Sequence, residues 1–268
     1  MNSSVKISPC GARPLLNPCR LDSFEYQIDP YIGCEHFCYY CYILGQAETD
    51  WRKEILIYPD ISEQLTAEIK GIPPQTIYMG NHTDPYQPCE AVCRQTRKVL
   101  EILRDHGFSA SILTKSDLVL RDLDIIGEMD NGAVSISVAF ADNKSHRLFE
   151  EKTRETAKRI EALGKFKDAG VKTGALLCPV IPYITDVFRL VDMLESHADT
   201  IWVYGLSMPD RNGPNRTYIE NILHRHYPGR AEEIMRILDS RENGYWAELS
   251  RRLQALKDER QLDIKIYV

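Results

Sequence analysis

The stretch that decides the fold is Tyr31-Ile32-Gly33-Cys34-Glu35-His36-Phe37-Cys38-Tyr39-Tyr40-Cys41-Tyr42, which places three cysteines within eight residues. A C-x3-C-x2-C spacing lets three thiolates reach one metal centre. It omits the fourth cysteine that ferredoxin-type electron carriers use for each cluster. Soft thiolates select iron–sulfur clusters, zinc or copper. A cluster held by only three cysteines keeps one iron open for a substrate or cofactor, so the stretch predicts a catalytic metal site with Cys34, Cys38 and Cys41 as ligands.

The alternative is a zinc loop completed by a remote cysteine or histidine, such as His36 or His82. Common zinc sites pair two short ligand doublets. The chain has no second C-x2-C pair to complete such a site. The sequence therefore favours an iron–sulfur cluster over zinc.

The composition is that of an ordinary globular protein: 268 residues, 43% of them hydrophobic and 27% charged. This length allows one large α/β domain or two small ones. No apolar run approaches the roughly 18 residues that span a bilayer, and residues 1–6 lack the apolar stretch of a signal peptide. We therefore expect a cytoplasmic protein with no membrane partner. In such a chain, eight cysteines suggest metal or redox chemistry rather than disulfides.

The net charge of −6 argues mildly against duplex DNA as a partner, because nucleic-acid binders normally carry a basic surface. A local basic patch is still possible around Arg211, Arg216, Arg225 and Arg230.

Strand-like apolar runs alternate with helical stretches, a pattern that indicates βαβ units and a parallel sheet. Strands are expected at residues 25–31, 76–80, 109–114, 133–140, 171–180, 200–206 and 263–268. Helices are expected at residues 91–106, 120–128, 154–169, 186–196, 218–226 and 231–259. We expect an N-terminal extension over residues 1–24, an α/β domain over 25–210 and a helical cap over 211–268 that packs on the same domain.

The cysteine loop, with an aromatic residue just before its third cysteine, resembles the signature of the radical S-adenosylmethionine (radical SAM) superfamily. The resemblance implies a partial (β/α)6 TIM-like barrel with a helical C-terminal extension, and six strand–helix units agree with it. It also implies a [4Fe-4S] cluster whose open iron binds S-adenosylmethionine. Tyr40 corresponds to the family aromatic that packs beside the adenine, and Tyr42 is expected to line the same cavity. The alternative for both tyrosines is packing of the loop.

Polar residues follow the ends of the second and third strands, where barrels of this type place active residues. The resemblance implies that this position contacts the amino group of S-adenosylmethionine, for which Thr83 and Asp84 offer hydroxyl and carboxylate acceptors. The alternative is a proline-bounded turn in which Asp84 is only a local cap. Lys115 could pair with the cofactor carboxylate, although most loop lysines are solvated.

The fourth strand carries Ser135 and Ser137 on one face, since alternate side chains of a strand share a face. They fit hydrogen bonds to a carboxylate or a ribose, or they are simply small residues in a crowded interior. After the fifth strand, Val180 and Ile181 are placed to pack on the adenine. Asp186 is expected to cap the next helix.

Further segments resemble the spore photoproduct lyase-like branch, whose members are often described as DNA repair photolyases. They are Thr83-Asp84-Pro85-Tyr86-Gln87-Pro88, Leu113-Thr114-Lys115-Ser116 and Ser135-Ile136-Ser137. The founding enzyme reverses a thymine dimer with the help of a cysteine near the end of strand two. Residues 80–82 of this chain contain no cysteine, so the resemblance carries the radical-forming machinery and not the substrate.

The sequence thus predicts an enzyme that cleaves S-adenosylmethionine reductively and uses the resulting 5′-deoxyadenosyl radical to abstract hydrogen from an unidentified organic substrate. An electron donor such as flavodoxin or ferredoxin is implied. The alternatives are a non-catalytic zinc or iron–sulfur module and a nucleic-acid repair lyase. His82 and His36 are candidates for proton transfer or cluster tuning, against a plain hydrogen-bonding role. Four further cysteines could hold an auxiliary cluster, although isolated cysteines are more often small buried side chains; they are Cys10, Cys19, Cys89 and Cys93.

Overall fold

The computed structural model describes residues 5–208, 210–240, 242 and 244–268. The first four residues of the expected N-terminal extension lie outside the described residues, as does residue 209 in the expected α/β domain. Contacts divide the chain into two compact units. The first unit comprises the described part of Met1–Phe37 with Ala47–Ser135 and Lys165–Lys172, and the second comprises Cys38–Gln46, Ile136–Gly164 and Thr173–Val268. The expected division at residues 24 and 210 stays a prediction.

The first unit contains two groups of hydrogen-bonded strands. One is β1 (Lys6–Pro9), β5 (Glu54–Ile57) and β4 (Tyr31–Ile32), in the order β1-β5-β4. The other has the order β2-β3-β6-β7, with β2 antiparallel to β3 and the rest parallel. Its strands are β2 (Leu16–Pro18), β3 (Tyr26–Ile28), β6 (Thr76–Met79) and β7 (Ser109–Thr114).

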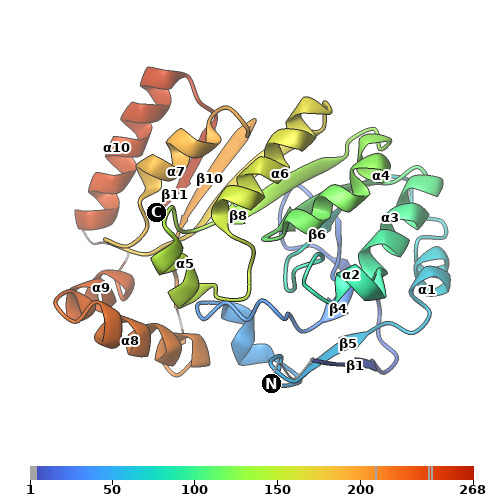
Figure 1. Cartoon of the computed structure of the whole chain (residues 1–268). Coiled ribbons are helices and arrows are strands. Elements are labelled where there is room, and N and C mark those ends of the chain that lie inside the picture. The colour runs from blue at the N-terminus through green and yellow to red at the C-terminus, as the bar shows by residue number, and fades with distance from the viewer. Residues whose placement is uncertain (1–4, 209, 241, 243) are drawn as a thin grey trace. The chain divides into compact units, whose positions relative to one another are not determined.

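The helices of the first unit connect and cover these strands. Helix α3 contacts α1, α4 and β7 (Figure 1). The buried side chains between them include Ile77, Leu100 and Ile112, all fully inaccessible. The elements are α1 (Ile61–Glu68), α2 (Glu90–Cys93), α3 (Gln95–Asp105), the 3-10 helix η2 (Asp117–Asp122) and α4 (Leu123–Gly127).

The single helix expected over residues 91–106 is wrong, because it is two helices broken at Arg94. Arg94 has a left-handed backbone with φ of 53°. The carboxylate of Glu90 accepts the backbone N–H groups of Thr96 (3.0 Å) and Arg97 (3.3 Å). These N–H groups start helix α3, and the first N–H groups of a helix have no partner inside it. The carboxylate of Glu90 therefore caps the start of α3, and the helix is not continuous through Arg94.

The second unit contains the strand order β8-β9-β10-β11, in which β10 pairs in parallel with both β9 and β11. The first three residues of β8 belong to the first unit and the last three to the second. The strands are β8 (Ala133–Val138), β9 (Lys172–Val180), β10 (Thr200–Gly205) and β11 (Ile264–Tyr267).

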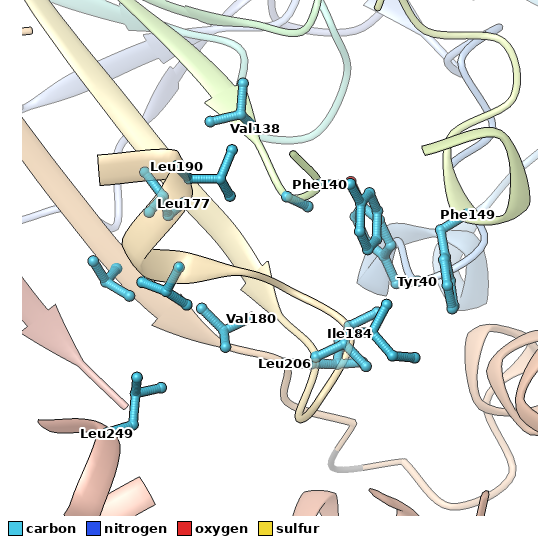
Figure 2. Packing of buried hydrophobic residues seen from close by; sticks show 14 of the residues in the cluster. Tyr40, Val138, Phe140, Phe149, Leu177, Val180, Ile184, Leu190, Leu206 and Leu249 are labelled. Carbon is cyan, nitrogen blue, oxygen red and sulfur yellow. The ribbon is translucent and has the colours of Figure 1, made fainter. Parts of the chain in front are cut away.

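The helices and strands of the second unit enclose a cluster of buried apolar side chains, part of which is shown in Figure 2. Helix α10 contacts β11, and α8 contacts α9 (Figure 1). The expected cap at Asp186 is confirmed, since its carboxylate accepts the N–H of Arg189 at 3.1 Å. The helices are η1 (Tyr42–Gln46), α5 (Asn143–Phe149), α6 (Thr156–Asp168), α7 (Val187–Leu194), α8 (Pro214–His226), α9 (Ala231–Leu238) and α10 (Gly244–Arg260). Of α6, the residues from Lys165 on belong to the first unit.

The expected long helix over residues 231–259 is also wrong, because α9 ends at Leu238 and α10 begins at Gly244. The buried indole of Trp246 donates to the carbonyl of Ile237 at 3.2 Å. This contact packs the start of α10 onto the end of α9, which requires a turn between them. Among the described helices, none is both long and apolar enough to cross a membrane.

Candidate active site

The first half of the cysteine loop, Gly33–Phe37, is held within the first unit by Gln87. The side chain of Gln87 is fully buried. Its amide donates to the carbonyl of Gly33 at 3.0 Å and accepts the N–H of Glu35 at 2.8 Å. Gln87 therefore fixes the backbone on both sides of Cys34. Gly33 has φ of 95°, and a Cβ there would lie 2.9 Å from Trp51 and Ile55, so this turn requires glycine.

Asp84 anchors the same half of the loop through His36. The Nε2 atom of His36 lies 3.3 Å from the carboxylate of Asp84, and their side chains are only 4% and 8% exposed. Asp84 also accepts the hydroxyl of Thr114 at 2.6 Å and the N–H groups of Lys115 (2.7 Å) and Tyr86 (2.8 Å). Both of its oxygens are thus engaged within the first unit.

The charge of Asp84 is well stabilised despite its burial. Burial by itself raises the pKa of this carboxyl, but the charge of His36 and the hydrogen bonds from His36, Thr114 and Lys115 together lower the pKa to about 2. Asp84 is therefore a carboxylate at neutral pH, in contact with the histidine that lies between Cys34 and Cys38.

Thr83 and His82 lie beside Asp29 in the first unit. The N–H groups of His82 and Thr83 donate to Asp29 at 3.0 and 3.1 Å, and the buried hydroxyl of Thr83 donates to the carbonyl of Tyr31 at 3.1 Å. The ring of His82 is 46% exposed, with Nδ1 3.2 Å from Asp29. This hydrogen bond raises the pKa of His82, although burial opposes the shift.

The second half of the loop, from Cys38 to Tyr42, belongs to the second unit. Cys38 is buried and Cys41 is half-buried, and the N–H of Cys41 donates to the carbonyl of Cys38 at 3.0 Å. The N–H of Tyr39 donates to the carbonyl of Phe149 at 3.1 Å. This half is therefore tied to the end of helix α5.

Tyr40 lies in the core of the second unit, in the same cluster as Phe140 and Phe149 (Figure 2). Its hydroxyl donates to the carboxylate of Glu150. Burial, then the neighbouring Cys38 and Glu150, raise the pKa of Tyr40 well above its ordinary value. The phenol therefore stays protonated and keeps its role as a donor.

The remaining predicted site residues differ in their burial and in the unit to which they belong. The hydroxyl of Ser137 is buried and donates to the carbonyl of Cys178 at 3.4 Å. Val180 is fully buried in the apolar cluster (Figure 2). Tyr42, in η1, is 55% exposed. Ser135 is half-buried in the part of β8 that belongs to the first unit.

The structure thus gathers the predicted site residues into two groups. Within the first unit, Asp84 contacts the backbone of Lys115 and the side chain of His36, while Thr83 and His82 share Asp29. Tyr40, Ser137 and Val180 belong to the second unit.

Two residues of this region were missed by sequence reasoning: Glu150 and Arg159. Both are fully buried and lie 2.7 Å apart. A signal for Arg159 was present, because it shares a helix face with Ala162, Leu163 and Phe166, all buried. A charge on an apolar helix face indicates a buried ion pair.

The basic patch suggested by the sequence is partly neutralised in the second unit. Arg216 pairs with Asp239 at 2.6 Å and with Glu220 at 2.8 Å, and Arg230 pairs with Glu233 at 3.2 Å. A cavity of about 480 Å³ between α8 and α9 has mixed charge, lined by Arg216, Glu220, His224, Glu232, Met235, Arg236 and Asp239. Neither feature forms the one-sign basic surface that phosphate binding favours.

The donor set of the loop fits an iron–sulfur cluster. The eight cysteines, all among the described residues, are outside disulfide bonds. The loop itself offers three thiols. Its one carboxylate is that of Glu35, whose Oε2 accepts the N–H of Cys89. Thiolates of this kind bind iron–sulfur clusters. The boundary between the units falls after Phe37. Within the described residues, no three His, Cys, Asp or Glu side chains stand gathered as a metal site, so the three-thiol assignment comes from the sequence spacing and the donor chemistry.

Comparison with known proteins identifies relatives in sequence. Residues 28–194, more than half of the chain, match the Radical SAM superfamily. An uncharacterized protein of Methanocaldococcus jannaschii is 31% identical over 196 residues, which are 71% of this chain and 74% of the relative. An uncharacterized protein of Mycobacterium tuberculosis is 28% identical over 222 residues, covering 76% of this chain and 64% of the relative.

Solved structures with a similar fold include spore photoproduct lyase and SuiB. A cysteine-to-alanine mutant of spore photoproduct lyase, with a dinucleoside spore photoproduct, has a TM-score of 0.57 at 19% identity, over 83% of this chain and 65% of that one. SuiB of Streptococcus suis, bound to its precursor peptide SuiA, has a TM-score of 0.57 at 14% identity, over 90% of this chain and 48% of that one. The chain therefore spans less than two thirds of both enzymes. These likenesses confirm the expected fold, a partial TIM-like barrel of the radical SAM type.

A three-cysteine loop with thiol donors, parallel β/α units and a superfamily match over residues 28–194 agree with one another. The chain belongs to the radical SAM superfamily and is an enzyme of that superfamily, one that uses S-adenosylmethionine and an iron–sulfur cluster.

Proposed function

We propose that Cys34, Cys38 and Cys41 hold a [4Fe-4S] cluster and that the enzyme abstracts hydrogen from an organic substrate. When bound and reduced, the cluster supplies the electron that cleaves S-adenosylmethionine to a 5′-deoxyadenosyl radical. The hard chemistry thus belongs to the cofactors, and the protein supplies binding, orientation and electrostatics.

The residues around the loop perform three tasks in this proposal. Gln87 and the Asp84–His36 pair hold the backbone around Cys34. Tyr40 and Glu150 hold the segment between Cys38 and Cys41. Since all these side chains except Asp84 are among the buried residues and Asp84 is 8% exposed, the ligand loop is fixed before any cofactor binds, which reduces the reorganisation needed on binding.

The contacts with S-adenosylmethionine are part of the proposal. We assign Thr83 and Asp84 to the amino group of the cofactor; both oxygens of Asp84 already accept hydrogen bonds. We therefore assign Asp84 an electrostatic contribution rather than a direct one. Lys115 and Ser137 are assigned to the polar groups of the cofactor, Ser135 to the carboxylate or the ribose, Tyr40 and Val180 to the adenine side, and Tyr42 and His82 to the substrate side.

The partners follow from the same chemistry. An electron donor such as flavodoxin or ferredoxin would be needed to reduce the cluster, and a site that excludes water would shield the radical from side reactions. The substrate is an organic molecule. A polynucleotide is not favoured, since Arg216 and Arg230 of the basic patch are paired with carboxylates.

The observation that carries this proposal is that each half of the cysteine loop has its own buried carboxylate, Asp84 on one side and Glu150 on the other. The test is anaerobic reconstitution of the full chain with ferrous iron and sulfide, followed by reduction with dithionite in the presence of S-adenosylmethionine. We expect about four irons per chain, a reduced-cluster electron paramagnetic resonance (EPR) signal, and production of 5′-deoxyadenosine.

The variants sharpen this test. Cys34→Ser, Cys38→Ser and Cys41→Ser should each lose the cluster and the 5′-deoxyadenosine. Cys10→Ser changes a half-buried cysteine outside the loop and should behave as the unchanged chain does. A colourless zinc protein, or a brown protein that never forms 5′-deoxyadenosine, would contradict the proposal.

A further inference from the structure

We propose that Glu150, held by Arg159, is a positioning residue for the cluster loop and that it acts through the hydroxyl of Tyr40. This inference rests on the proposed function, because it assumes that Cys38 and Cys41 bind the cluster. Its subject is the second unit alone, to which all these residues belong.

The two oxygens of Glu150 have separate partners. Oε1 accepts the hydroxyl of Tyr40, and Oε2 accepts Nη2 of Arg159 at 2.7 Å together with a longer hydrogen bond from the hydroxyl of Thr153 at 3.4 Å. Glu150 is fully buried. A carboxylate whose oxygens are divided between a phenol and a guanidinium has one orientation, so the position of Arg159 determines where the hydroxyl of Tyr40 lies.

Arg159 is in turn fixed to the strand and the loop beside it. Its Nη1 donates to the carbonyl of Ser137 in β8 at 2.7 Å, and its Nη2 also donates to the hydroxyl of Thr153 at 2.5 Å. Its side chain has no exposure to solvent. The chain of contacts therefore runs from the end of β8 through Arg159 and Glu150 to Tyr40, the residue just before the third cysteine.

Packing alone does not explain this arrangement. Tyr40 lies in an apolar cluster with Phe140 and Phe149, where a phenylalanine would fill nearly the same space. Burying an ion pair has a desolvation penalty that apolar residues avoid. What the ion pair adds is direction: it fixes one rotation of the ring between Cys38 and Cys41, as outer-shell partners orient the ligands of other metal sites.

The test compares Tyr40→Phe, Glu150→Gln and the double variant, each as the full reconstituted chain. The readouts are iron content, the EPR spectrum of the reduced cluster before and after S-adenosylmethionine is added, and the Kd for S-adenosylmethionine. Losing an outer-shell partner typically costs about 10–100-fold in metal affinity or activity, so we expect each single variant to lower the iron content, to raise this Kd and to alter the EPR change on binding. Because both act through one hydrogen bond, the double variant should be no weaker than the worse single variant.

Thr173→Val is the matched control. The buried hydroxyl of Thr173 donates to the carboxylate of Asp199 at 3.0 Å, in the same unit but at the start of β9. It should lower the melting temperature about as much as Tyr40→Phe does, with an unchanged Kd and spectrum. An unchanged Kd and spectrum in Tyr40→Phe would overturn the proposal, whether or not Glu150→Gln folds. Additive effects of Tyr40→Phe and Glu150→Gln on the Kd would overturn it as well. If the unchanged chain itself binds no cluster, it is the proposed function that fails.

Discussion

The two halves of the cysteine loop are anchored by buried carboxylates of different kinds. On the Cys34 side, Asp84 accepts two backbone N–H groups and a hydroxyl, and its contact with the loop is a histidine. On the Cys41 side, Glu150 has a guanidinium as its partner and reaches the loop through a phenol. The first anchor combines the charge of His36 with several neutral donors, whereas the second pairs with a fully buried guanidinium.

The two anchors should therefore respond differently when one of their partners is removed. Loss of one donor to Asp84 leaves others in place, because the carboxylate has at least four contacts. Loss of Glu150 leaves a buried cation without its counter-charge. The Cys41 side should therefore be the more fragile half of the loop.

The largest effect is expected for Glu150→Ala. It leaves Arg159, whose side chain is 0% exposed, without its ion-pair partner, which typically costs about 3–5 kcal/mol. Urea unfolding of the chain without cofactors measures this loss in the free energy of unfolding. The double variant Glu150→Ala/Arg159→Met removes the unpaired charge and should recover a large part of it. If Glu150→Ala unfolds at the same urea concentration as the unchanged chain, the ion pair is not the basis of this anchor.

A smaller effect is expected for Asp84→Asn. The amide keeps one acceptor oxygen for the hydroxyl of Thr114 or the N–H of Lys115 and loses the charge that faces His36. Hydrogen bonds to charged groups contribute about 1.5–3 kcal/mol, so the free energy of unfolding should fall by about that amount, less than for Glu150→Ala. The reverse ranking of the two variants would contradict the contrast between the anchors.

The pH dependence of the Asp84 anchor follows from its lowered pKa. A carboxyl whose pKa is about 2 in the folded chain and about 3.9 in the unfolded chain binds fewer protons when folded at intermediate pH. Its contribution is fully present above the unfolded value and is lost as the pH falls through the folded one. Urea unfolding between pH 6 and about pH 3 should therefore show less acid sensitivity in Asp84→Asn than in the unchanged chain.

The sequence predicted one anchor better than the other, and the reason is distance along the chain. Asp84 lies in a polar run after a strand, so it was recognised as a site residue, although its contact with His36 was not foreseen. Glu150 follows a helix that the sequence analysis did not predict, α5. Its partners Tyr40 and Arg159 are 110 and 9 positions away, and no local pattern joins them.

The same limits apply to the fold. The parallel strands β6 to β10 were predicted to within about two residues because their apolar runs are continuous. The short strands β1, β2, β4 and β5 were not distinguished, since two to four residues carry too little pattern. The breaks at Arg94 and after Leu238 depend on the contacts of Glu90 and Trp246, which arise only in the folded chain.

The smallest effect on stability is expected for the contact between His82 and Asp29. This contact is half-exposed, so it tests whether exposure weakens an ion pair relative to the buried anchors. The hydrogen bond with Asp29 raises the pKa of His82 above its ordinary value, although burial opposes it. Such a group stabilises the fold below the unfolded pKa of about 6.5, and this contribution is lost as the pH rises through the folded value. Asp29→Asn should therefore lower the pKa of His82 toward 6.5, as followed by NMR titration of its ring protons. With 46% of the His82 side chain exposed, solvent screens the pair, and the pH dependence of the melting temperature should change only slightly. A large loss of stability in Asp29→Asn would show instead that Asp29 acts through the N–H groups of His82 and Thr83, as a third anchor of the buried kind.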